Sequence, residues 1–197
     1  MKDRKSGREK IEPKPETGRS DIGRKHPFLC AAFMILILGG IVYAPALQSP
    51  VFIQDEESIL QNPLISHYKN IPHIFSQDFL LFTSGQYRPF PYVVLAGIRT
   101  FVSPSDPVFW HLWLVGFHML NALLVFMLVR NFAVHPAVPY IAAALFCVHP
   151  LCTMPVGNIN QFHIVLGTFL FLGVANAYIS YVRSSKVSFY LFALILY

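Results

Sequence analysis

Three adjacent carboxylates, Asp55, Glu56 and Glu57, are the residues of this 197-residue chain whose type and spacing most directly suggest chemistry. A carboxylate at a membrane surface can act as a general base, because partial removal from water tunes its pKa. Its oxygens can instead bind a divalent cation, or the acids can form a hydrated loop. Successive helical residues diverge by about 100°, so at most two of these acids can share one task.

Three further polar residues are candidates for binding a ligand. Arg88 lies in the sequence YRPF, and its guanidinium fork would suit a phosphate group, although a surface arginine in a proline-bounded turn is the plainer interpretation. His149 precedes Pro150 near the end of an apolar run, and Asn158 lies in the polar turn 157–163. These two side chains could meet a ligand headgroup or simply hydrate the turn.

The elements that carry these residues are expected to be membrane helices. The chain is 54% hydrophobic and 13% charged, whereas soluble domains carry about 25% charged residues. Cys30, Cys147 and Cys152 lie in or beside apolar runs, at spacings that fit neither a disulfide framework nor a zinc site. We interpret them as small apolar residues.

Residues 1–27 are predicted to form a disordered basic tail on the cytoplasmic side. Nine of the 15 Lys and Arg residues lie within residues 1–26, together with several Gly and Pro. Such a segment buries too little apolar surface to offset its chain entropy. Without interleaved aromatic residues, it is expected to contact anionic membrane lipid and not nucleic acid.

The remaining residues, 28–197, predict an all-α fold: a polytopic transmembrane helix bundle of about four spans plus a truncated fifth. An external loop, 48–107, includes an amphipathic stretch at 90–102 that is too short to span and is expected to lie in the interface. The spans are predicted near 28–47, 108–129, 137–156 and 163–182, with an incomplete one at 187–197.

Basic residues set the predicted topology. The tail, Arg130 and the pair Arg183 and Lys186 would all face the cytoplasm, which places the N-terminus there and the acids outside. The membrane would be the bacterial inner membrane or the endoplasmic reticulum. A cleaved signal peptide ending near Ala44-Pro45-Ala46 is the alternative to a retained first span.

Within the spans, polar residues are expected to serve packing. Pro150 should kink or end the third span, because proline lacks the backbone N–H that continues a helix. His111 and His118 share a helix face and are expected to be satisfied inside the bundle. Asn121 should hydrogen-bond to a neighbouring helix.

The order of these pieces resembles the N-terminal region of C-type (GT-C) membrane glycosyltransferases. A first span is followed by the acids, then YRPF, then FWHLWLVGFHMLNALLVF and AALFCVHPLCTMPVGNI, so the resemblance covers roughly residues 28–183. The chain is most similar to the group in which a polytopic membrane half precedes tetratricopeptide repeats, the transmembrane O-mannosyltransferases. Each motif is short, and their order and spacing carry the likeness.

The resemblance implies a sugar donor carried on a polyprenyl phosphate and an acceptor hydroxyl on a protein or glycan. Family members activate the acceptor with an acid in the first external loop, a position that falls on Asp55, with Glu56 as its neighbour. Arg88 could stabilise the leaving phosphate, which is an electrostatic inference and not a family motif. No cofactor is firmly expected, although the acids themselves could bind a divalent cation.

Two functions therefore stay open at this stage. The first is the N-terminal part of an inverting, polyprenyl-phosphate-dependent glycosyltransferase whose other spans and repeats lie beyond Tyr197, so that residues 1–197 alone are not expected to be active. The second is a non-catalytic polytopic scaffold or transporter segment whose external acids only hydrate a loop. The scarcity of ionisable residues in the spans weighs against a transporter.

Overall fold

The computed structural model describes residues 26–47, 61–76, 87–100 and 107–197, and within these ranges the chain is helical with no strand. The all-α prediction is therefore confirmed. The α-helices are α2 (Pro27–Leu47), α4 (Ile71–Ile74), α5 (Pro89–Arg99), α6 (Pro107–Arg130), α7 (Val138–Val148), α8 (Thr153–Gly157), α9 (Phe162–Ser184) and α10 (Val187–Leu196). Short 3₁₀ turns are η2 (Pro63–Ile65), η3 (Tyr68–Asn70), η5 (Pro150–Cys152) and η6 (Ile159–Gln161).

Three helices, α2, α6 and α9, are long and apolar enough to cross a bilayer, with 21, 24 and 23 residues. A helix needs roughly 20 apolar residues to cross the hydrocarbon core. They correspond to the spans predicted at 28–47, 108–129 and 163–182. Helix α10, at 10 residues, is too short to cross, as predicted. The protein is thus a membrane protein by the length and composition of its helices.

The fourth candidate span, predicted as 137–156, is bent. Helix α7 ends at Val148, and the segment Pro150–Gly157 continues at an angle of 48° to it. The predicted kink at Pro150 is confirmed. Because Pro150 has no N–H, the carbonyl of Phe146 loses its helical partner, and the Cys152 thiol lies 3.7 Å from that oxygen as a weak donor.

A second carbonyl at the bend is satisfied by another helix. The N–H of Leu151, which would have bonded to Cys147 in a continuous helix, instead donates to Nδ1 of His149. The Cys147 carbonyl accepts from Nε2 of His118 on α6 at 3.0 Å. Since a carbonyl can only accept, Nε2 carries the proton. The expected satisfied role of His118 is confirmed, and α6 holds the bend in place.

Small side chains and amides join the long helices. Helices α2, α6 and α7 meet around Ala31, Ala122 and Ala143, which are completely buried, as is typical where membrane helices approach closely. Asn121 donates to the carbonyl of Val165 on α9 at 2.9 Å, which confirms its predicted role. In the opposite direction, Asn176 of α9 donates to the carbonyl of Leu124 on α6 at 3.1 Å.

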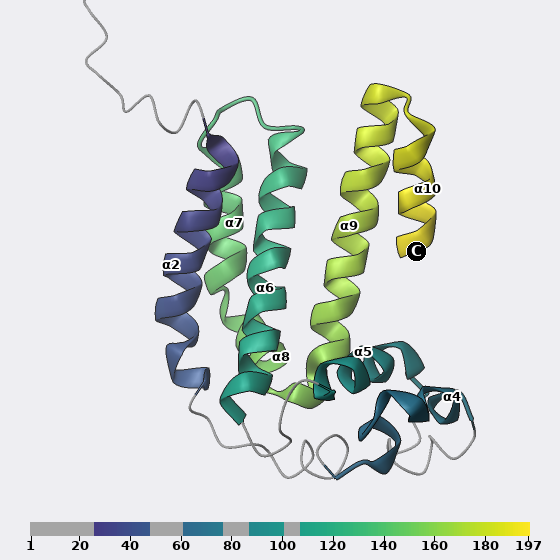
Figure 1. Ribbon diagram of the computed structural model, residues 1–197. Coiled ribbons are helices and arrows are strands. Elements are labelled where there is room, and N and C mark those ends of the chain that lie inside the picture. Colours follow the sequence, from purple (N-terminus) through teal and green to yellow (C-terminus); the bar gives the residue numbers. More distant parts are fainter. Residues whose placement is uncertain (1–25, 48–60, 77–86, 101–106) are drawn as a thin grey trace, which may run out of the picture.

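One end of the bundle carries a cap of short helices. Helix α5 and residues 61–76 pack there against the start of α9, in the lower part of Figure 1. Tyr92 and Leu95 of α5 are buried with Trp110 and Leu114 of α6 and Phe162 of α9. The predicted short helix within 90–102 is therefore confirmed as α5, which begins one residue earlier. The cap closes the end of the bundle at which α9 begins.

Three of the six Lys and Arg residues in the described part of the chain lie at the opposite end of the bundle. Helices α6 and α9 both end there, and α2 begins there (Figure 1). Arg130 and Lys186 are exposed, and Arg183 reaches across to Asn131. The tail residues 1–25, whose disorder was predicted, lie outside the described residues. The sequence predicted that the start of the first span and the ends of the spans before Arg130 and Arg183 lie on the same side of the membrane. The start of α2 and the ends of α6 and α9 do lie at the same end of the bundle (Figure 1).

Candidate functional site

Arg88 and His163 meet where the cap touches the bundle. The guanidinium Nη1 of Arg88 lies 2.5 Å from Nε2 of His163, although the two residues are 75 positions apart in sequence. Both side chains are half-buried. Arg88 directly precedes α5 and His163 is in the first turn of α9, so the pair joins the N-terminal ends of two helices.

Backbone geometry orients both partners of this pair. Arg88 stands before Pro89, which disfavours the α region for the preceding residue, and its backbone lies outside that region, with φ −134° and ψ 68°. The other ring nitrogen of His163, Nδ1, donates to the carbonyl of Asn160 at 3.1 Å. Because that carbonyl can only accept, Nδ1 carries the proton and Nε2 presents a lone pair to Arg88. His163 in this arrangement is a neutral imidazole.

Asn158 extends the same chain of hydrogen bonds. Its side-chain oxygen accepts from the N–H of Asn160 at 3.0 Å and so begins the turn η6. The links run from Asn158 through Asn160 and His163 to Arg88. Two of the predicted binding residues, Arg88 and Asn158, are thereby brought into one network, in which Asn158 shapes the turn.

His149, the third predicted binding residue, has a different local role. Its Nδ1 accepts from the N–H of Leu151 at 3.2 Å and starts the turn η5 after the bend. Its side chain is exposed. Within the described part of the chain, no hydrogen bond joins it to Arg88 or His163. The geometry therefore assigns His149 to the bend and leaves its contact with a ligand a prediction.

The predicted catalytic acids, Asp55 and Glu56, lie outside the described residues. All ten acidic residues of the chain do so, whereas six Lys and Arg residues lie within the described ranges. The segments on either side of Asp55 do reach the capped end. Leu47 and Ala46, at the end of α2, pack with Val156 and Val165, and the turn η2, which follows Asp55 in sequence, contacts α5.

A second arginine at this end has a structural partner. Arg99, the last residue of α5, donates from Nη1 to the backbone carbonyl of Asn62 at 3.3 Å. It ties residues 61–76 to α5. Burial lowers the pKa of its guanidinium from the ordinary value. Because the ordinary pKa of arginine is above 12, the side chain remains charged in neutral solution.

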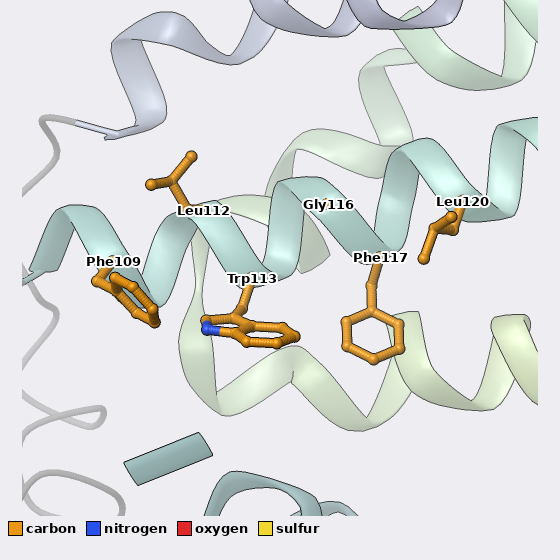
Figure 2. Close-up of a pocket in the computed structure, with 6 residues that line it drawn as sticks. All are labelled: Phe109, Leu112, Trp113, Gly116, Phe117 and Leu120. Carbon is orange, nitrogen blue, oxygen red and sulfur yellow. The ribbon is translucent and has the colours of Figure 1, made fainter. Parts of the chain in front are cut away.

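An apolar groove runs along α6 beside this network. Figure 2 shows aromatic side chains that follow one another along the helix. The groove has a volume of about 460 Å³ and is lined by Phe109, Leu112, Trp113, Gly116, Phe117 and Leu120. The Phe117 ring meets the ring of Phe162 edge-on, with centroids 5.4 Å apart. Phe162 directly precedes His163, so the groove contacts the same first turn of α9 that carries the partner of Arg88.

Sequence reasoning placed His163 and Asn160 among the polar residues of the turn 157–163 but did not single them out. His163 is one of several polar residues in 157–163, and nothing in the spacing identified its partner. The crowding of polar side chains in that turn was a visible signal. The contact with Arg88 depends on how α5 packs against α9, which periodicity does not reveal.

This arrangement can bind an anion next to an apolar chain. A fixed guanidinium supplies directed N–H donors for phosphate oxygens, and the groove supplies apolar surface. No group of three or more His, Cys, Asp or Glu side chains within the described ranges could hold a metal ion. A divalent cation bound by the acids is therefore still a prediction. Comparison with protein-family models, curated proteins and solved structures finds no match to this chain.

Proposed function

We propose that this chain belongs to an integral membrane glycosyltransferase that moves a sugar from a polyprenyl-phosphate donor to an acceptor hydroxyl. The observation that carries the proposal is the Arg88–His163 pair. It fixes a cation at the first turn of α9, where Phe162 contacts the apolar groove on α6, at the end of the bundle where α2 ends. A lipid-linked sugar phosphate has the matching parts, an anionic group and a long apolar chain.

In the proposed reaction, Asp55 is the general base. It takes the proton of the acceptor hydroxyl while the hydroxyl oxygen attacks the sugar carbon that bears the phosphate. The bond from that carbon to the phosphate oxygen breaks, the configuration inverts, and polyprenyl phosphate leaves with the bonding electrons. Arg88 stabilises the negative charge that builds on the phosphate, and Glu56 supports the base. Removing one such charge-stabilising donor typically slows catalysis about 10²–10³-fold.

The groove on α6 is the surface that we propose for the polyprenyl chain. Trp113 and Leu120 are 40% and 47% exposed, so the groove opens to the surroundings of the bundle. Its aromatic rings lie on one side of the helix, with Phe109 to Trp113 and Trp113 to Phe117 each separated by 6.3 Å between centroids. An apolar chain lying there would bring its phosphate toward Phe162 and His163.

Asp55→Asn in the full-length protein tests the proposed function. Loss of general-base help should lower the initial rate of sugar transfer by about 10²–10⁴-fold. Membrane insertion should be unchanged, because the substitution preserves size. Glu57→Gln is the matched control. At most two of the three acids can share one task, and the resemblance selects Asp55 and Glu56, so Glu57→Gln should transfer sugar at the wild-type rate. Wild-type transfer by Asp55→Asn would reject Asp55 as the general base, and absence of transfer by the wild-type protein would reject the enzyme proposal in favour of a non-catalytic scaffold.

A transporter is less well supported than a scaffold as the alternative. The buried amides and imidazole that join the spans, Asn121, Asn176 and His118, donate to backbone carbonyls of neighbouring helices. Their polar atoms thus serve helix packing. Groups that line a transport path would instead face one another or a water-filled cavity.

We also propose that the capped end faces away from the cytoplasm, with the N-terminus inside. Arg130, Arg183 and Lys186 lie at the opposite end, where the positive-inside rule favours cations. A cysteine introduced at exposed Gln61, in a protein without Cys30, Cys147 and Cys152, should react with an impermeant thiol reagent added outside sealed cells or inside the lumen. Reaction from the cytoplasmic side alone would invert this topology.

A further inference from the structure

Arg88 is held by a neutral partner, which is unusual for a half-buried arginine. The common partner is a carboxylate, and a carboxylate would cancel the charge of the guanidinium. Nε2 of His163 offers a lone pair and no charge, because its proton is on Nδ1 and faces Asn160. The pair therefore keeps a full positive charge in a fixed place.

Among the described residues, this hydrogen bond occupies only one part of the guanidinium and leaves its other donors for another group. A guanidinium carries five N–H donors, and His163 accepts from one of its two terminal nitrogens. Arg88 is positioned from both sides, by the backbone before Pro89 and by the imidazole. Such a fork, held at one nitrogen, can present parallel N–H groups to two phosphate oxygens.

The surrounding helices strengthen the attraction for an anion. Helix α5 begins at Pro89 and α9 begins at Phe162, so the N-terminal ends of both helices lie beside the pair. A helix N-terminus carries a partial positive charge and disfavours a cation. Arg88 is therefore placed where it adds to the local positive potential. An anion bound there would be attracted by the guanidinium and by the N-terminal ends of α5 and α9.

From this geometry we propose that His163 is the positioning residue for Arg88, and that it orients the guanidinium toward the phosphate of a lipid-linked substrate. The proposal rests on the proposed function for the identity of the substrate class. His163 does not touch the reacting atoms in this scheme. It acts through Arg88, and Asn160 acts through His163 by fixing the proton on Nδ1.

Binding of farnesyl phosphate to the full-length protein in detergent tests the proposal, with uncharged farnesol as the reference. Wild type should bind the phosphate more tightly than the alcohol. His163→Asn, whose amide is too short to reach Arg88 as Nε2 does, should weaken phosphate binding roughly tenfold. Its affinity for farnesol should stay at the wild-type value, which a general structural defect would not allow.

Two further variants separate positioning from folding. His163→Gln can place its side-chain oxygen near the position of Nε2 and should restore phosphate binding to within about threefold of wild type. Arg88→Lys keeps the charge but lacks the fork, so it should also lose roughly tenfold in phosphate affinity. If His163→Asn fails to fold, Arg88→Lys still tests whether the orientation of the Arg88 guanidinium matters. Phosphate binding by Arg88→Lys at the wild-type affinity would show that it does not.

The outcomes distinguish this proposal from the proposed function. Wild-type phosphate binding by His163→Asn would overturn the role of His163, even where Asp55→Asn has abolished transfer. Equal binding of phosphate and alcohol by the wild-type protein would overturn the anion site itself. Loss of farnesol binding together with phosphate binding in His163→Asn would assign His163 to structure alone. In the double variant Arg88→Gln/His163→Asn, the effects should not add, because both substitutions remove the same interaction.

Discussion

Helix α9 meets an arginine at each of its ends, and the two arginines are held in different ways. At the far end, exposed Arg183 directs both terminal nitrogens to Asn131, with Nη1 donating to its side-chain oxygen at 2.8 Å and Nη2 to its backbone carbonyl. At the near end, half-buried Arg88 directs one nitrogen to His163. The first fork makes two hydrogen bonds to Asn131, whereas the second makes one, to His163, among the residues that the structure describes.

The helix ends make the contrast sharper. Arg183 lies where α6 and α9 end, and C-terminal helix ends carry partial negative charge that stabilises a cation. Arg88 lies where α5 and α9 begin, against the preference of the helix dipoles. A cation that opposes its local field contributes little to stability there, which is compatible with the anion site that we propose.

Arg88→Gln is expected to have the largest effect among the arginine substitutions. Loss of the charge at the leaving phosphate should lower kcat for sugar transfer by about 10²–10³-fold. The midpoint of thermal unfolding in detergent should stay close to that of wild type. Sugar transfer by Arg88→Gln at the wild-type rate would show that Arg88 does not stabilise the leaving phosphate.

Arg99→Gln should have an intermediate effect, on stability and not on chemistry. It removes the hydrogen bond from α5 to the Asn62 carbonyl, which is worth about 1 kcal/mol of unfolding free energy. Thermal unfolding should report the loss, with transfer reduced severalfold at most. Since Arg99 stays charged despite its lowered pKa, its contribution should not change between pH 6 and 9. A loss of transfer as deep as that of Arg88→Gln would mean that Arg99 also contacts substrate.

Arg183→Gln should have the smallest effect. Exposed substitutions usually change stability by about 0.5 kcal/mol or less, and the two hydrogen bonds to Asn131 are open to water. Sugar transfer should be within twofold of wild type, because this end of α9 is remote from the cap. A large loss of transfer would show that the two ends of the helix are functionally alike.

The network at the capped end was only partly predictable. Arg88 and Asn158 were selected from residue type and local context, and both belong to it. His163 and Asn160, which connect them, were not selected, because 75 positions separate Arg88 from His163. His149 was selected beside them, yet its ring nitrogen serves the backbone at the bend. Side-chain chemistry identifies candidates, and packing decides which of them meet.

The spans, by contrast, follow from the sequence alone. Lipid offers no hydrogen-bond partners, so an uncharged run of about 20 residues must satisfy its own backbone as a helix. The runs that became α2, α6 and α9 leave no other choice. The break before Pro150 was also visible, because a missing N–H ends a helix wherever it occurs.

Tertiary structure decided how those helices and the cap are joined. The Cys147 carbonyl freed at the bend could have met any donor, and the packing of α6 against α7 brought His118 to it. In the same way, burial of Tyr92 and Leu95 against Phe162 set α5 on the start of α9 and brought Arg88 to His163. Local sequence fixes which backbone groups need partners, whereas only the shared apolar core brings distant side chains within hydrogen-bonding distance.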